Sequence, residues 1–105
     1  MFATVRRYEG IDASHKDELT KKVGESLAPR LSKLPGFSGY FLIEAGNGVM
    51  TSISLFDTSA HADESTRLAS SWVRDEKLES ALPNAPKITF GEVIAQRKTN
   101  GAVRA

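Results

Sequence analysis

The sequence predicts one α+β domain whose elements run strand, helix, strand, strand, helix, strand. Three observations predict this class: an alternating first segment, two apolar stripes at helical spacing, and an Asn-Gly pair between two segments rich in aromatic and β-branched residues. That order is the split βαβ arrangement. We therefore expect an antiparallel four-stranded sheet with both helices on one face.

The length of 105 residues fits one compact domain, which we assign to residues 1–97. The remaining residues, 98–105, have no periodic apolar face, and we expect a flexible tail there. Hydrophobic residues make up 40% and charged residues 26% of the chain, as in ordinary globular proteins. The net charge of +1 provides no concentrated basic surface, so we expect no nucleic-acid partner.

Cysteine is absent, which excludes disulfides, thiolate nucleophiles and metal sites with sulfur ligands. Two histidines cannot form a metal cage alone, so we expect no metal and no cofactor. No apolar run approaches the ~20 residues of a membrane span, and the chain begins with a strand-like segment instead of a leader. We therefore expect no membrane partner and a cytoplasmic location.

The first strand is predicted at Phe2–Tyr8, where apolar and polar residues alternate up to Gly10. Helix one follows, with Ser14 and Asp17 spaced as a capping box. Pro29 predicts a kink over residues 25–29, because proline removes one backbone hydrogen bond. A Pro-Gly turn at residues 35–36 ends the helix. Its apolar stripe consists of Leu19, Val23, Leu27, Leu31 and Leu34.

The central hairpin is predicted from residues 37–45 and 49–56, joined by Asn47 and Gly48. If these two residues form the centre of the turn, Gly46 faces Val49 and the register follows. One face then carries Phe37, Phe41, Ile43, Ser52, Ser54 and Phe56, and the other carries Tyr40, Leu42, Glu44, Thr51, Ile53 and Leu55. Both faces are substantially apolar. Two helices cover only one of them, so we expect the other to meet a second subunit. The residues leave open which face is which; of the two, the first is the better pocket wall and the second the better dimer seam.

A second helix is predicted over residues 59–78, with N-cap oxygens available from Asp57, Thr58 and Ser59. A Pro-Asn-Ala-Pro break at residues 83–86 precedes a last strand over residues 87–96. At 100° per residue the inward stripe carries His61, Ser65, Leu68 and Trp72, flanked by Ala62 and Ala69, and the opposite side carries Asp63, Thr66, Arg67, Ser70 and Arg74.

Three segments resemble the antibiotic-biosynthesis-monooxygenase-like proteins of the dimeric α/β-barrel superfamily. They are Leu34-Pro-Gly-Phe leading into Gly39-Tyr40, the strand end Ser54-Leu-Phe-Asp, and Ser71-Trp-Val within the second helix. The resemblance extends from Phe2 to about Ala95. It implies a ferredoxin-like protomer that pairs sheet to sheet as a homodimer, with a ligand cavity between helices and sheet. The family includes cofactor-independent oxygenases of phenolic or polyketide-like aromatics, haem-degrading relatives and isomerases, and fold alone does not select among them.

The site residues of two branches are only partly present. The haem-degrading branch typically uses a first-strand asparagine, a tryptophan and a histidine of the second helix. Here the first strand carries Arg6 and Arg7, and His61 precedes Trp72 by 11 residues. The quinone-forming branch has an asparagine, a tryptophan, a tyrosine and an arginine tied to its site, and only Trp72 can be placed among them.

Two residues are candidates for catalysis: His61 as a general base and Trp72 as an aromatic wall for a ligand. The alternatives are a histidine packed at the rim of the sheet and a tryptophan that only fills the core. The candidate substrate-binding residues are Tyr40, Phe41, Ser52, Ser54, Ser65 and Leu68, which combine hydroxyl groups with apolar surface; ordinary strand and interface side chains are the alternative. No nucleophile–base–acid order, phosphate loop or carboxylate cluster at metal spacing is present.

Three functional hypotheses follow. The first is a homodimeric, cofactor-independent monooxygenase acting on a small aromatic or polyketide-like substrate, with the substrate supplying the reducing power. The second is a small-molecule-binding or stress-associated dimer of the same fold without catalysis. The third, a purely structural partner domain, predicts a pocket too small or too closed for a ligand.

Overall fold

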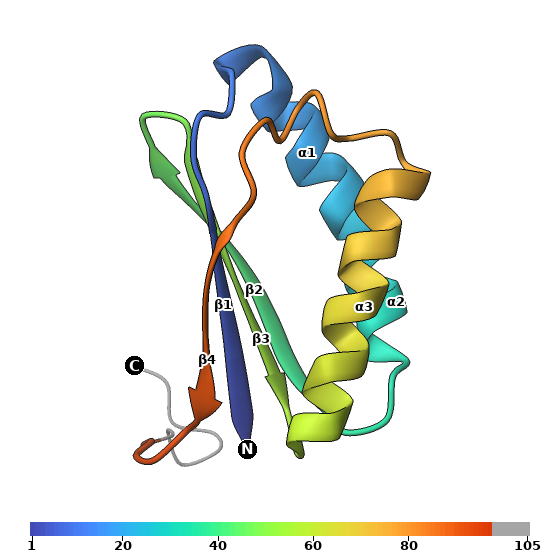
Figure 1. The fold of residues 1–105 in the computed structure, drawn as a ribbon, viewed down its shortest axis with the longest axis vertical. Helices are drawn as coiled ribbons and strands as arrows, with labels where there is room; N and C mark the ends of the chain where they lie inside the picture. The colour runs from blue at the N-terminus through green and yellow to red at the C-terminus, as the bar shows by residue number, and fades with distance from the viewer. Residues whose placement is uncertain (98–105) are drawn as a thin grey trace, which may run out of the picture.

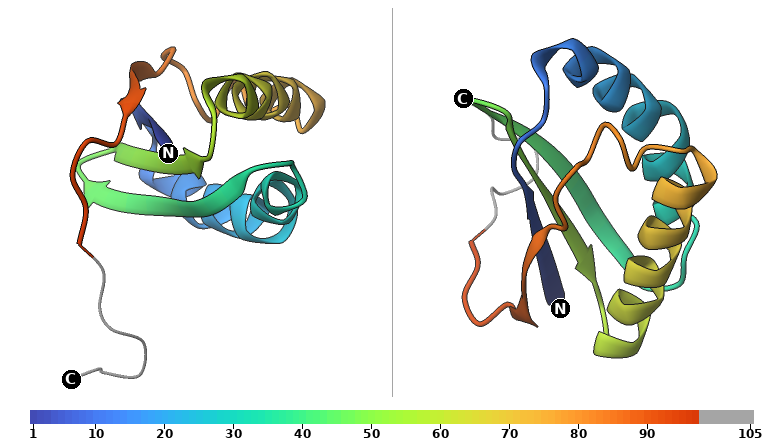
Figure 2. Two further views of the ribbon diagram at one scale, coloured as in Figure 1. Left: turned by 90° about the horizontal axis from the view of Figure 1, so that it is seen from below. Right: turned by 45° about the horizontal axis from the view of Figure 1, so that its top comes forward.

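The computed structural model, which describes residues 1–97, contains one four-stranded sheet covered by helices on one face (Figure 1). Every neighbouring pair of strands is antiparallel, and the spatial order is β2-β3-β1-β4. Within residues 1–97, the opposite face of the sheet carries no helix (Figure 2). This arrangement confirms the predicted α+β fold. The strands are β1 (Phe2–Tyr8), β2 (Phe37–Gly46), β3 (Val49–Phe56) and β4 (Lys87–Glu92).

The last strand ends at Glu92 and not at residue 96 as predicted. Beyond it, one further backbone hydrogen bond of 2.8 Å runs from the N–H of Val93 to the carbonyl of Met1. The predicted flexible tail, residues 98–105, lies outside the described residues. Within residues 1–97, no helix combines the length and apolar character that crossing a bilayer requires.

The first helical region is interrupted next to Pro29, as predicted. A π-helical turn, η2 (Val23–Leu27), separates α1 (Lys16–Lys22) from α2 (Ala28–Ser32). The N–H of Ala28 bonds to the carbonyl of Val23, five residues earlier. Because Pro29 has no N–H to continue the α-helical ladder, the wider turn takes up the irregularity at this point.

The capping box predicted from Ser14 and Asp17 does not form. Instead, the carboxylate of Asp12 accepts a 2.9 Å hydrogen bond from the N–H of Ser14, at the start of a short 3₁₀ turn, η1 (Ala13–His15). His15 is the N-cap of α1 and makes no side-chain cap bond. The carboxylate of an Asp readily accepts a hydrogen bond from the backbone N–H two residues later, which closes a compact turn. The capping residue is therefore Asp12, two residues before the predicted Ser14.

The turn of the central hairpin is confirmed, with φ of 56° at Asn47 and 76° at Gly48 and with Gly46 paired to Val49. The next pair is Glu44 with Met50, so one residue, Ala45, is left over as a β-bulge. Gly46, with φ of 84°, provides the left-handed backbone at this irregularity.

The bulge makes the predicted faces of β2 wrong for residues 40–44. Because side chains alternate along a strand, one extra residue moves these side chains to the other face relative to β3. Tyr40 and Leu42 therefore pair with the buried serines of β3 and face the helices. Phe41 and Ile43 lie on the outer face and are 55% and 44% exposed. The serine-bearing side of β3 does face the helices, as predicted. A second irregularity between Phe37 and Gly39 leaves Phe37 paired with Phe56, on the same face as predicted.

Helix α3 (Ser59–Asp75) begins at Thr58, whose hydroxyl accepts a 3.1 Å hydrogen bond from the N–H of His61. It ends before the predicted residue 78. Lys77 adopts a left-handed backbone with φ of 57°, and the N–H of Leu78 bonds back to the carbonyl of Val73 at 3.0 Å. This is a Schellman ending, in which the buried Leu78 anchors the chain just beyond the helix.

The hydrophobic core lies between the helices and the sheet, because each element has one apolar face and these faces meet. The buried core residues are Ile11, Leu19, Val23, Leu27, Leu31, Met50, Ala69, Trp72, Leu78 and Ala81.

Candidate ligand cavity

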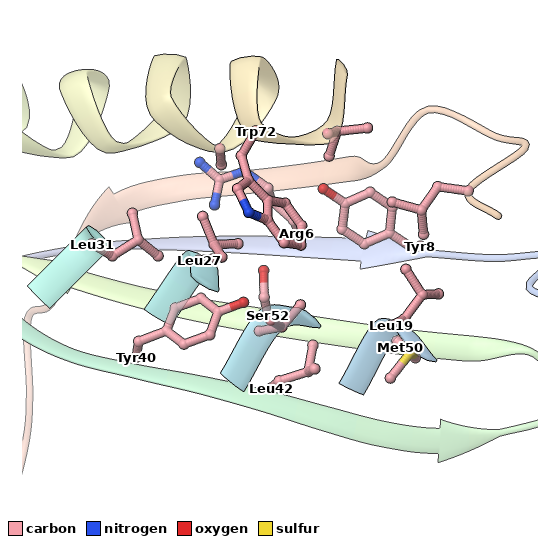
Figure 3. Close-up of a pocket in the computed structure, with 14 residues that line it drawn as sticks. Arg6, Tyr8, Leu19, Leu27, Leu31, Tyr40, Leu42, Met50, Ser52 and Trp72 are labelled. Carbon is pink, nitrogen blue, oxygen red and sulfur yellow. The ribbon is translucent and has the colours of Figure 1, made fainter. Parts of the chain in front are cut away.

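A cavity of about 50 Å³ lies within this core, between the helices and the sheet (Figure 3). Its wall is mainly aliphatic and aromatic, and a few polar side chains enter it from β1, β2 and β3. Small-molecule sites commonly combine these features. The lining residues are Arg6, Tyr8, Leu19, Val23, Leu27, Leu31, Tyr40, Leu42, Met50, Ser52, Ala69, Trp72, Val73 and Leu82.

Arg6 is the charged residue of the cavity wall. It is 5% exposed, because its place on β1 directs it under α3, and its Nη2 donates a 2.6 Å hydrogen bond to Thr66 Oγ1. Among residues 1–97, no carboxylate forms an ion pair with it, whereas its neighbour Arg7 pairs with Glu9 at 2.7 Å on the solvent side. Burial lowers the pKa of Arg6, and the two nearby tyrosines act in the opposite direction.

Tyr8 and Tyr40 are the two tyrosines of the chain, and both line the cavity. Burial raises the pKa of Tyr8, an effect that Arg6 reduces. Burial, and then the proximity of Tyr8, raises the pKa of Tyr40 to about 12, while the hydroxyl of Ser52 and the charge of Arg6 lower it. Figure 3 shows the hydroxyls of Tyr8, Tyr40 and Ser52 directed toward the middle of the cavity. Both phenols are therefore neutral hydrogen-bond donors at neutral pH.

Trp72 forms the wall on the α3 side and is 2% exposed. Its Nε1 donates a 2.9 Å hydrogen bond to the hydroxyl of Ser26, which lies in the π-helical turn η2. A buried indole N–H needs such a partner, and this one holds the ring in a fixed orientation.

A second, more open hollow of about 220 Å³ adjoins the cavity. It lies between α3, β1, β4 and the segment before β4, and Thr66, Ser70, Glu79 and Asn84 contribute its polar groups. Asn84 also donates a 3.0 Å hydrogen bond to the carbonyl of Glu9, which attaches this segment to the end of β1. The residues that line both spaces are Arg6, Tyr8, Ala69, Val73 and Leu82.

The structure brings together three of the predicted site residues: Trp72, Tyr40 and Ser52 all line the cavity. Ser54 and Ser65 are buried but do not line it. Ser65 Oγ donates to the carbonyl of Ala62 at 2.6 Å, and Ser54 Oγ has no hydrogen-bond partner among the described residues.

Two further predicted residues lie elsewhere. Leu68 packs against the edge of the core without lining the cavity, and Phe41 lies on the outer face of the sheet because of the bulge at Ala45.

His61 is not brought to the cavity. It lies in the first turn of α3, where its Nδ1 contacts Asp57 Oδ1 at 2.6 Å. Trp72 follows it by 11 residues on the same helix, which at 1.5 Å per residue is a rise of about 16 Å. The hydrogen bond from His61 lowers the pKa of Asp57. The pair links the start of α3 to the turn at Gly36, whose carbonyl accepts from the N–H of Asp57 at 2.9 Å.

Sequence reasoning missed three polar residues of this region: Arg6 and Tyr8, which line the cavity, and Thr66, which lines the adjoining hollow. Alternation along β1 places Thr4, Arg6 and Tyr8 on one face, and this signal was available. The alternation alone does not indicate which face of β1 points toward the core, because each face carries one arginine, Arg6 or Arg7. Thr66 was assigned to the outer side of its helix, whereas the structure places it over β1 in contact with Arg6.

The cavity and the adjoining hollow of about 220 Å³ together can hold and orient a small ring compound, through hydrogen-bond donors on one side and apolar contacts on the other. They do not fit a haem group. No histidine lines the cavity or the adjoining hollow, and about 50 Å³ is far below the volume of a porphyrin. Even an engineered apolar cavity that accepts benzene measures ~150 Å³.

No family model matches the sequence, and no curated protein matches it. Solved structures do match the fold. A protein of unknown function from Nitrosomonas europaea superposes with a TM-score of 0.75 at 18% identity, covering 95% of each chain. A monooxygenase from Streptomyces coelicolor, solved with nanaomycin D, superposes with a TM-score of 0.73 at 15% identity, covering 94% of this chain and 92% of the other.

A dimeric ferredoxin-like protein from an uncultured marine organism superposes with a TM-score of 0.69 at 14% identity, covering 93% and 98% of the two chains. At these identities the likeness shows the fold alone. This chain therefore has the ferredoxin-like fold that the resemblance implied, and its function must be argued from its own residues.

Proposed function

We propose that this chain is a cofactor-independent monooxygenase acting on a small aromatic or polyketide-like substrate. One observation carries the proposal: Arg6, Tyr8, Tyr40 and Ser52 direct polar groups into an otherwise apolar cavity walled by Trp72. The monooxygenase solved with nanaomycin D has the same fold, which is consistent with a small-molecule ligand.

We assign the two reactants of this reaction to the two adjoining spaces. The hollow of about 220 Å³ has room for a ring system, and the inner cavity of about 50 Å³ has room for a small group or for dioxygen. The residues common to both walls lie where the two would meet. Holding the ring and dioxygen together in a dry, fixed geometry accelerates their reaction without a further catalytic group.

The chemistry balances without an external reductant. One oxygen atom of O₂ replaces two hydrogens on an activated ring carbon, and those hydrogens leave with the other oxygen atom as water. The ring supplies all four electrons that O₂ accepts. The roles of the chain are to bind the ring, to orient it against Trp72 and to exclude bulk water.

We also propose a homodimer that pairs through the uncovered face of the sheet. Phe41 and Ile43 are exposed on this face, with Val5, Ile53 and Leu55 half-buried beside them. An apolar face of this kind commonly marks a protein interface. The structure of a dimeric ferredoxin-like protein with the same fold supports a dimeric assembly, without specifying the face that pairs.

Oxygen consumption tests the catalytic proposal. The wild-type protein should take up O₂ with members of a panel of anthrone-like compounds, whose ring CH₂ carbon carries the two hydrogens that the step replaces, and Tyr40→Phe and Trp72→Phe should reduce the rate. Arg7→Gln, which changes the opposite, uncovered face of the same strand and leaves the cavity wall intact, is the matched control and should leave the rate unchanged. Binding of panel compounds without any O₂ uptake would favour the non-catalytic ligand-binding dimer instead.

A further inference from the structure

Arg6 has a feature that ligand orientation alone does not require: it is a buried cation without a counter-charge. A guanidinium carries five N–H donors, and among residues 1–97 only Thr66 accepts from it, at 2.6 Å. The titratable groups that share its surroundings are Tyr8 and Tyr40 in the cavity and Glu79 in the adjoining hollow. None of them forms an ion pair with it.

Burying a charge without a partner is unfavourable, and the lowered pKa of Arg6 reflects this cost. An apolar side chain at this position of β1 would avoid the cost and would continue the aliphatic wall. The charge is therefore best explained by an interaction that the protein alone does not make. Arg6 lines both the cavity and the hollow, so a ligand in either space can reach it.

The neighbouring polar groups favour the same kind of ligand atom. Tyr8 and Tyr40 stay protonated at neutral pH because burial raises the pKa of both, so each can donate a hydrogen bond. Ser52 adds a third hydroxyl. No carboxylate lines the inner cavity. A cluster that combines one cation with several hydroxyl donors stabilises an acceptor that carries negative charge.

We propose that the cavity binds its ligand through an ionised oxygen of a ring compound, held by Arg6 and by the hydroxyls of Tyr8 and Tyr40. The inference rests on the proposed function only in taking the cavity as a ligand site; it does not require that the ligand reacts with dioxygen. The oxyanion can be a ring phenolate or a ring carboxylate. Arg6 is a binding residue in this assignment, and Thr66 is a positioning residue that fixes its guanidinium.

The probe that tests this inference is 4-nitrophenol, because its phenolate absorbs visible light and its phenol does not. At a pH slightly below the pKa of the free probe, adding wild-type protein should increase the visible absorbance, since binding beside Arg6 stabilises the phenolate. In calorimetry the phenolate should bind about tenfold more tightly than the neutral analogue 4-nitrotoluene, as expected of one charge-assisted hydrogen bond. Benzoate serves as the carboxylate arm.

Three variants sharpen the test. Arg6→Gln should abolish both the absorbance increase and the preference for the anion. Arg6→Lys should retain part of both, and circular dichroism shows whether each variant is folded. Arg7→Gln removes the adjacent arginine, on the opposite face, and should behave as wild type. If Arg6→Gln does not fold, the wild-type absorbance change and the ratio between the two probes still decide the question.

The outcomes separate the two proposals. Equal binding of 4-nitrotoluene and 4-nitrophenolate by the wild type overturns the oxyanion inference and leaves a ligand cavity in place. An unchanged preference in folded Arg6→Gln overturns it as well. Failure of all three probes to bind overturns both the inference and the proposed function. Tighter binding of benzoate than of the phenolate identifies a carboxylate as the oxyanion, and the reverse identifies a phenolate.

Discussion

The indole Nε1 of Trp72 donates a 2.9 Å hydrogen bond to the hydroxyl of Ser26 and so connects α3 to the π-helical turn η2. The two residues are far apart in sequence and lie on the two helical segments that cover the sheet. Because η2 is the irregular part of its helix, this bond sets the separation of the two helices above the cavity.

Trp72→Ala should lower the free energy of unfolding by ~3 to 5 kcal/mol, because it removes a buried side chain and leaves a void. Trp72→Phe keeps most of the apolar volume but leaves the Ser26 hydroxyl without its hydrogen-bond donor. The free energy of unfolding should therefore fall by only ~1 kcal/mol. Urea unfolding measures both. Ser26→Ala is the matched control for the hydrogen bond; if it costs nothing, the bond does not hold the helices together.

Tyrosine ionisation should be shifted upward from pH 10.0, the ordinary pKa of the side chain, because burial raises the pKa of both tyrosines. Since Tyr8 and Tyr40 are the two tyrosines of the chain, an ultraviolet titration of tyrosinate reports on the cavity alone. The raised pKa of about 12 for Tyr40 contributes stability that is fully present below pH 10.0 and is lost as the pH rises toward 12. In Tyr40→Phe the later part of the titration should disappear. Ordinary ionisation of both residues at pH 10.0 would show that the cavity is open to water.

Thr66→Val should weaken oxyanion binding without destroying the fold, because it removes the hydrogen-bond acceptor of Arg6 at nearly constant volume. We expect a loss of about 1 kcal/mol in stability, typical of one hydrogen bond. The preference for 4-nitrophenolate over 4-nitrotoluene should also shrink. Thr66→Ser keeps the hydroxyl and should restore the preference. A variant that loses stability but keeps the full preference would assign Thr66 a structural role only.

Ile43→Lys should convert the proposed dimer into a folded monomer, because it places a charge in the middle of the uncovered sheet face. Ile43→Val keeps the apolar surface and should remain dimeric. Sedimentation velocity at micromolar concentration measures the change. A wild-type protein that is monomeric under these conditions would contradict the assembly proposal outright.

The contact between His61 and Asp57 should contribute to stability in an acid-dependent manner. The hydrogen bond lowers the pKa of Asp57 below its ordinary 3.8. A lowered pKa contributes stability that is present above 3.8 and is lost as the pH falls below that value. In His61→Ala the pKa of Asp57 should return toward 3.8, and nuclear magnetic resonance titration of the carboxylate would detect it. O₂ uptake unchanged by His61→Ala would remove the predicted role of His61 as a base.

Local rules predicted most of the fold. The turn at Asn47 and Gly48, the interruption beside Pro29 and the start of α3 at Thr58 each depend on residues close in sequence. The bulge at Ala45 was not predictable in this way. An alanine fits equally well as a paired strand residue and as the extra, unpaired residue of a bulge, so its identity does not indicate which of the two it is.

The site was predicted only in part for a related reason. Trp72 stands out as the one tryptophan and the large residue of its stripe, and Ser52 and Tyr40 carry hydroxyl groups in strands. Arg6 stands out only when the inward face of β1 is known. His61 was favoured for its chemistry, but the cavity lies farther along the helix than the position of this residue.

The bulge at Ala45 also bears on how this protein can change. Removing that single residue would move the β2 side chains between Gly39 and Glu44 from one face of the sheet to the other, up to the second irregularity of the strand beside Phe37. Phe41 and Ile43 would enter the cavity, and Tyr40 would move to the outside of the sheet. A one-codon deletion would therefore change the proposed ligand wall and the proposed subunit surface together, without substituting any side chain that forms either of them.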